Sequence, residues 1–424
     1  MNCRYTKSTI LTAFDKATVW LLLLSPILGI YGVGPFNLCT FITWIVILLG
    51  LLKQRLNMKL RPVIRYYFIY LSFVTFISCV FSAEELIGRG FGVVHSFLLF
   101  ALFFSIKDFD LLYKSYKVLA LISLGLFYAQ EISFTLTGIR ISGLIPFLPI
   151  NSSLNDASNT YTFQELLTLV YRSSSFFSEP AHFAQFLLPL LPLSLYLENG
   201  RKRIFYFIIT ITALFLLKSG NGIIGLIAIM VAFFVFNFKK MSLKYIAIIS
   251  VCLLCLGVFG IKFIVNSESG QKYNERYEEM FAGSNVDEDA SGFTRIYPGY
   301  YVYAEYDTFE KVFGINNFGV IQAKMKLSRY GYLLDGVLYF NTVQHFLLKA
   351  GIIGLFFFLF MLIDIYRGNN YCGKTLVIVF LLLSLISSIY LTPTMILYFL
   401  FGYGIKERDL NHNNQNISKV CITK

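Results

Sequence analysis

Residues 345–366 read HFLLKAGIIGLFFFLFMLIDIY, an apolar run with two charged side chains, Lys349 and Asp364. About 20 predominantly apolar residues of α-helix are needed to cross the hydrocarbon core of a bilayer. The run is long enough to do so, and it therefore predicts a transmembrane helix.

The composition of the whole chain agrees with this prediction. Of its 424 residues, 56% are hydrophobic and 14% are charged, whereas soluble domains carry about 25% charged residues. The formal net charge of +12 comes largely from short basic loops between apolar runs, which is a signal of membrane topology. We therefore expect a lipid bilayer around the chain and predict no nucleic acid partner.

Further apolar runs divide the rest of the chain. A block at 375–404 is too long for one span and contains TPT at 392–394, whose proline disfavours a continuous helix, so we expect two helices there, the last one short. We predict an all-α, polytopic integral membrane protein with about 12 transmembrane helices, forming a single transmembrane domain over residues 1–424. The other runs lie at about 17–33, 36–52, 63–82, 91–106, 115–137, 181–197, 204–218, 222–237 and 245–264.

The short loops assign the two sides of the membrane, because Lys and Arg are enriched in cytoplasmic loops. The most basic short loop, KQRLNMKLR at 53–61, then lies inside, and both termini are cytoplasmic. Two long segments lie outside: a first large external loop at 138–180, and a second at 265–344 with short helices of its own.

The stretch RSSSFFSEPAHFAQF at 172–186 places polar residues at the outer start of a span. Proline suits the first turn of a helix, and Ser178 is expected to cap it. One interpretation is a capped helix with an interfacial arginine; the other is a polar site at the depth of a lipid head group. The candidate residues are Arg172, Ser175, Ser178, Glu179 and His182.

The connection SGNG at 219–222 offers a second polar site, through Ser219 and Asn221. It joins two spans on the outer side, so the N–H groups of the following helix would point outward and suit an anionic group. The alternative interpretation is a tight helix hairpin.

The second external loop places Arg295 among tyrosines, of which Tyr297 is the nearest. Tyrosine rings provide platforms for sugars, and an arginine grips phosphate oxygens with two donors; an interfacial aromatic belt is the alternative. Asn341, His345 and Lys349 follow at the outer start of the next span. Lys349 either extends its amine to the interface or neutralises a phosphate.

Four of these patterns occur in the same order and between the same spans as in a known family. They are R-x-x-S-F-F-S-E-P-x-x-F-A at 172–184, S-x-N-G at 219–222, F-G-x-x-x-F-G at 313–319 and N-T-V-Q-H-F-L-L-K-A-G-I-I-G at 341–354. Together they resemble the O-antigen and capsule repeat-unit polymerases of the Wzy type, which are related to the O-antigen ligases.

The resemblance implies a GT-C-like glycosyltransferase at the outer face of a bacterial plasma membrane. Such an enzyme joins undecaprenyl-pyrophosphate-linked oligosaccharide repeat units, which serve as donor and acceptor, into O-antigen, capsule or exopolysaccharide. It needs no nucleotide sugar and no metal, so we predict no cofactor. A chain-length regulator is a further partner that the resemblance leaves open.

The resemblance also suggests roles for the candidate residues. Its functional arginines match Arg172 and Arg295, which would stabilise the departing pyrophosphate. Glu179 is the first candidate for the base and His182 the second. Substrate-binding roles then fall to Arg295, Ser175, Ser178, Ser219, Asn221, Tyr297, Asn341, His345 and Lys349.

Two other functions stay open at this point. O-antigen ligases carry a His-Asn pair where this chain has Phe340-Asn341, which favours a polymerase over a ligase. A flippase for lipid-linked oligosaccharides would place polar groups along a central path, whereas the polar residues here lie at the outer ends of the spans.

Overall fold

The computed structural model describes residues 13–33, 36–52, 56, 60–80, 82–151, 173–237, 296–328 and 340–422, with the side chains of the last range described to Arg408. These parts of the chain are mostly helical, and six of their helices are long and apolar enough to cross a membrane. This confirms the prediction of a helical membrane protein. The six candidate spans are Pro62–Cys79, Ala83–Phe103, Phe109–Thr137, Pro180–Leu197, Gly220–Asn237 and Thr342–Tyr366.

Every apolar run that falls within the described residues forms helix, while the run at 245–264 lies outside them. The helices before this gap are α1 (Ala13–Leu28), α2 (Leu38–Leu52), α3 (Pro62–Cys79), α4 (Ala83–Phe103), α5 (Phe109–Thr137), α7 (Pro180–Leu187), α8 (Leu190–Leu197), α9 (Gly200–Leu216) and α10 (Gly220–Asn237). Those after it are α14 (Pro298–Ala304), α15 (Thr308–Phe313), α16 (Phe318–Leu327), α17 (Thr342–Tyr366), α18 (Tyr371–Ile386) and α19 (Pro393–Ile422).

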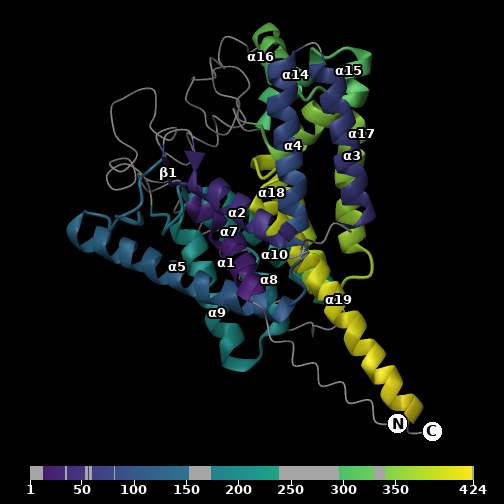
Figure 1. The fold of residues 1–424 in the computed structure, drawn as a ribbon. Coiled ribbons are helices and arrows are strands. Elements are labelled where there is room, and N and C mark those ends of the chain that lie inside the picture. Colours follow the sequence, from purple (N-terminus) through teal and green to yellow (C-terminus); the bar gives the residue numbers. More distant parts are fainter. Residues whose placement is uncertain are drawn as a thin grey trace.

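Three local features differ from the prediction. The connection between α1 and α2 contains a short antiparallel pair, β1 (Gly32–Val33) and β2 (Phe36–Asn37), so the fold is not purely helical. The run at 181–197 forms two consecutive helices, α7 and α8, because prolines at its centre lack the N–H that a continuous helix needs. The last helix, α19, is not short, and its C-terminal part extends away from the other helices (Figure 1).

The termini of the helices lie in two groups, one at each end of the bundle. At one end, α14, α15 and α16 lie over α3, α4 and α17 (Figure 1), and Asn316 donates to Thr75 at 2.7 Å. At the other end, Lys117 pairs with Glu198. The ends that basic loops assign to the cytoplasm thus lie together, opposite the ends assigned outside. Which end faces the cytoplasm stays a prediction.

Helix α17 is kinked inside its apolar run. Gly351 has φ 63° and ψ −164°, values outside the helical region. A kink frees carbonyl groups, and in a membrane these must find other donors. Ile315 N–H donates to Leu348 O at 2.8 Å and the Tyr70 hydroxyl to Ala350 O at 3.1 Å, so the broken turn is satisfied by its neighbours.

Candidate functional site

A cavity of about 180 Å³ lies between the N-terminal part of α4, the first turns of α17, the connection between α15 and α16, and the start of α16. It brings together segments that lie more than 200 residues apart in the chain. Two of its lining side chains are cationic, and none of the residues that line it is a carboxylate. They are Arg89, Asn316, Phe318, Ile321, Phe340, His345, Leu348 and Lys349.

Arg89 reaches the cavity from α4. Its guanidinium lies 5.1 Å from the centre of the Phe318 ring, and its Nε donates to Glu85 Oε2 at 3.2 Å. It lies six residues into the helix, which corresponds to a depth of about 9 Å from the helix start. An arginine at this depth, held by an aromatic face, leaves its remaining donors for an anion.

Sequence reasoning missed Arg89, because the apolar run at about 91–106 predicts a span that begins after it. The helix instead begins at Ala83, since Ser82 caps it and accepts from Glu85 N–H at 3.5 Å. The signal was in the sequence: Ser82 followed three residues later by Glu85 is a capping-box pattern. Because the first turn of α4 contains charged residues, a search for apolar runs does not include it.

Lys349 faces the same cavity from α17. Its Nζ lies 4.9 Å from the centre of the Tyr390 ring. It lies seven residues into the helix, at a depth of about 10 Å from the helix start, which is close to that of Arg89. Two cations that line one cavity create a local preference for an anionic group.

His345 lies one turn before Lys349 on α17. Its ring stacks on Tyr390 with centroids 5.3 Å apart, and its Nε2 lies 3.1 Å from Ser388 Oγ. Within the described residues, its buried Nδ1 has no hydrogen-bond partner. The histidine is therefore held from two sides and presents one ring nitrogen that a ligand or water could satisfy.

Asn341 caps the start of α17. Its side chain accepts from Gln344 N–H at 2.9 Å, and Gln344 returns the bond by accepting from Asn341 N–H at 3.1 Å. Gln344 also donates to the carbonyl of Ile296 at 2.6 Å. Asn341 thus has a capping role, and the residue that follows Arg295 in the chain is fixed to the first turn of α17.

Asn221 joins the same region from α10. Ser387 at the end of α18 donates to Asn221 Oδ1 at 3.0 Å, and its carbonyl accepts from the Thr342 hydroxyl at 2.7 Å. The starts of α10 and α17 are therefore tied to one end of α18, next to the Ser388 that contacts His345. Ser219, just before α10, is buried, and its carbonyl accepts from Ile223 N–H at 3.0 Å as part of the helix start.

The polar stretch before α7 has a geometry that differs from the prediction. Ser178 does not cap the helix; Glu179 occupies the cap position, and Pro180 is the first helical residue. The Ser178 hydroxyl instead lies 2.8 Å from His182 Nδ1. Helix α7 packs against α10, whose Asn221 accepts from the Ser387 hydroxyl at the end of α18.

Ser175 is held by α5 and lies in a different cluster. Its N–H donates to Gln130 Oε1 at 2.8 Å, and its hydroxyl donates to Ser123 O at 2.7 Å. The contacts it makes are thus those of a buried structural residue. Beside it, Arg140 packs its guanidinium 3.6 Å from the centre of the Phe134 ring, and burial lowers the pKa of Arg140. The cavity between them is small, at about 10 Å³.

The predicted second external loop is described at residues 296–328 and 340–344. Tyr297 precedes α14, and its carbonyl accepts from Tyr300 N–H at 3.0 Å. Tyr306 is buried and its hydroxyl donates to Leu348 O at 3.4 Å; burial raises the pKa of Tyr306, and the Glu310 carboxylate adds to the rise. Tyr306 is thus a packing residue rather than an exposed platform for sugars.

Arg172 and Arg295, the two arginines that the resemblance singles out, both lie outside the described residues. Of the other predicted site residues, Asn221, Asn341, His345 and Lys349 come together around the ends of α10, α17 and α18. Ser178, Glu179 and His182 form a neighbouring group at α7, and Ser175 is separate.

Two sequence patterns associated with cofactors turn out to be structural. G-x-x-x-x-G-K-T, the pattern of nucleotide-binding loops, occurs at 368–375, but such loops follow a strand, and this one joins α17 to α18. Its centre is filled by Asn369, which donates to Gly402 O at 2.7 Å. D-x-D occurs at 108–110, where Asp108 caps α5. Among the described residues, no three His, Cys, Asp or Glu side chains are grouped to hold a metal.

Comparison with known proteins gives no matching family model, no matching curated protein and no matching solved structure. The function is therefore argued from the site and from the sequence patterns.

Proposed function

We propose that this protein is a membrane glycosyltransferase that joins lipid-linked oligosaccharide repeat units into a surface polysaccharide. Donor and acceptor are both carried on undecaprenyl pyrophosphate. The observation that supports this most strongly is the cavity in which Arg89 and Lys349 converge at about the same depth below the outer helix ends. Two cations near the ends of spans suit the negative charge of a lipid-linked pyrophosphate.

The proposed reaction is the transfer of a growing glycan. The hydroxyl oxygen of the acceptor sugar bonds to the anomeric carbon of the donor, while the bond from that carbon to the pyrophosphate oxygen breaks. Polyprenyl pyrophosphate leaves with the bonding electrons, and the hydroxyl proton passes to a base. Glu179 is the first candidate for this base and His182 the second, because both lie at the start of α7.

The cations would act on the leaving group. Negative charge grows on the pyrophosphate as the bond breaks, and fixed cations in a partly dry site stabilise that charge most at the transition state. Arg89 and Lys349 join Arg172 and Arg295 in this proposed role. The bond from Gln344 to Ile296 supports a place for Arg295 in the same site.

The finer architecture belongs to the same proposal. It includes about 12 spans, a GT-C-like arrangement, cytoplasmic termini and a bacterial plasma membrane. A chain-length regulator would act at the outer face, beside α14 to α16.

Deletion of the gene tests this proposal. We expect the ladder of surface glycan on a gel to collapse to single capped repeat units, and a plasmid copy to restore it. A complete ladder in the deletion strain would contradict the proposal. Long glycan that accumulates on undecaprenyl pyrophosphate without reaching lipid A would instead identify a ligase.

A further inference from the structure

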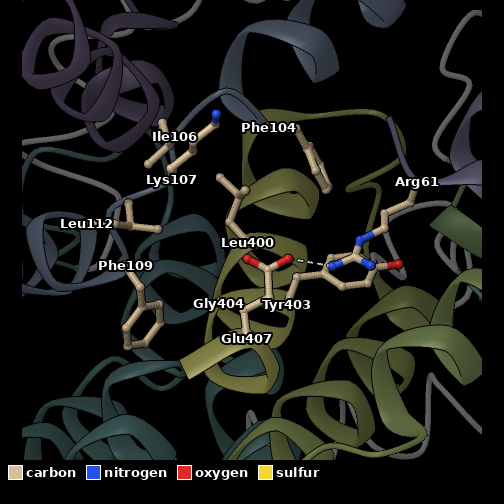
Figure 2. Close-up of a pocket in the computed structure, with 10 residues that line it drawn as sticks. All are labelled: Arg61, Phe104, Ile106, Lys107, Phe109, Leu112, Leu400, Tyr403, Gly404 and Glu407. Atoms are coloured by element: carbon tan, nitrogen blue, oxygen red, sulfur yellow. Dashed lines mark hydrogen bonds and ion pairs between the residues drawn. The ribbon is translucent and has the colours of Figure 1, made fainter. Parts of the chain in front are cut away.

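A second cavity, of about 300 Å³, lies at the opposite end of the bundle. Figure 2 shows the residues that line it. It is bounded by the residue before α3, by the connection between α4 and α5, and by α19. It thus lies at the ends of three candidate spans, which begin or end at Pro62, Phe103 and Phe109. This is the depth at which a bilayer changes from acyl chains to headgroups.

The walls of this cavity are largely apolar. Five of its ten lining side chains are aromatic or aliphatic hydrocarbon. Gly404 lets α19 pack closely on α5 beside the cavity, because a Cβ there would lie 2.4 Å from Phe109 Cδ2. The apolar residues are Phe104, Ile106, Phe109, Leu112 and Leu400.

The rim of the cavity is cationic. Arg61 stacks on Tyr403, 4.7 Å from the ring centre, and pairs with Glu407 at 2.6 Å (Figure 2). Lys107 lines the other side and is exposed; among the described residues, no ion-pair or hydrogen-bond partner meets its amine. The rim therefore carries one cation more than its single carboxylate neutralises.

We propose that this cavity binds the headgroup of an anionic phospholipid from the adjacent leaflet. Its phosphate contacts Lys107 and shares Arg61 with Glu407, and the start of an acyl chain lies along the apolar wall. A water occupies about 30 Å³ of liquid, so the cavity holds about ten water-sized groups, the size of a glycerophosphate headgroup. The exposed Arg61–Glu407 pair, with side chains 36% and 60% exposed, contributes little by itself and can rearrange around a phosphate.

Lipid titration of the purified protein tests this proposal. The full chain in detergent is mixed with phosphatidylglycerol or with phosphatidylcholine, and bound lipid is counted by native mass spectrometry. We expect phosphatidylglycerol to be retained and phosphatidylcholine to be lost. Lys107→Gln should lower the affinity for phosphatidylglycerol about fivefold, the effect of one basic residue near an anionic surface.

Lys114→Gln is the matched control. Lys114 is an exposed lysine in the second turn of α5, and it does not line the cavity. Equal retention of both lipids by the native protein, or equal losses in the two variants, would overturn the proposal. A competition experiment with sn-glycerol 3-phosphate distinguishes a lipid from a soluble phosphate ester. Displacement of the lipid by this compound at millimolar concentration would show that the cavity binds a free phosphate ester instead.

Discussion

Gly314 and Gly351 touch backbone to backbone, although 37 residues separate them. A Cβ on Gly314 would lie 2.3 Å from the Gly351 nitrogen, and a Cβ on Gly351 would lie 2.7 Å from the Gly314 nitrogen. Both have positive φ, 82° and 63°. This contact fixes the kink of α17 against the connection between α15 and α16, two residues from Lys349, and so sets the position of one cation of the proposed site.

Gly351→Ala should therefore disturb both fold and site. The backbone conformation there is almost restricted to glycine and costs another residue about 1–3 kcal/mol, and the added methyl group would also meet Val312 O at 2.2 Å. We expect a lower melting temperature in detergent and little long-chain glycan. Gly92→Ala is the control, because nothing lies within 4 Å of a Cβ on Gly92; equal stability of the two variants would contradict the contact.

Arg89→Gln should remove activity and leave the fold intact. The Arg89–Glu85 pair is partly exposed, at 36% and 29%, and such pairs contribute about 0–1 kcal/mol to stability. Loss of one donor to a departing charge lowers turnover about 10²- to 10³-fold. The gel ladder should collapse to short glycans at unchanged protein level. Arg201→Gln, on α9 at the other end of the bundle, should keep a normal ladder.

Lys349→Met tests the second cation. Methionine has a similar length and no charge, so the apolar surroundings tolerate it, and we expect unchanged or higher thermal stability with short glycans. If Lys349 and Arg89 act on one phosphate group, the double variant should lose less activity than the product of the two single losses. Lys374→Met, which removes a lysine packed over Tyr371, is the control; a normal ladder in Lys349→Met would remove this residue from the site.

The topology can be checked with reporter fusions. Fusions at positions 155 and 310 should report the outside, and fusions at positions 57 and 242 should report the inside, because short basic loops face the cytoplasm. Both phosphatase and fluorescent reporters are needed, since each is active on one side only. A reversed pair would place the Arg89 cavity at the cytoplasmic face and would contradict the proposed chemistry.

Sequence reasoning found the helices more reliably than their ends. Apolar runs mark the residues that meet lipid or core, and each described run became helix. The start of α4 was missed because Glu84, Glu85 and Arg89 in its first turns are polar. The kink at Gly351 was missed because its cause, Gly314, is distant in sequence.

The candidate site could be predicted only in part, for the same reason. His345, Lys349 and Asn341 stood out because they are polar residues at the start of an apolar run. Arg89 did not stand out. Its place in the candidate site depends on Phe318 and Lys349, which are distant in the sequence and line the same cavity only in the folded chain. Ser175 stood out in a polar stretch, yet its partners on α5 account for it as a packing residue.

The most direct test of the central claim is polymerisation by the purified protein. Undecaprenyl-pyrophosphate-linked repeat unit is supplied as the sole substrate, and the products are separated by size, for the native protein and for Arg89→Gln, Arg172→Ala and Arg295→Lys. We predict a ladder of lipid-linked glycans from the native protein, with release of undecaprenyl pyrophosphate, and only traces of short products from Arg89→Gln and Arg172→Ala. Arg295→Lys should lose most activity, because lysine lacks the two parallel donors of arginine. No ladder from the native protein, or a normal ladder from Arg89→Gln and Arg172→Ala, would contradict the account.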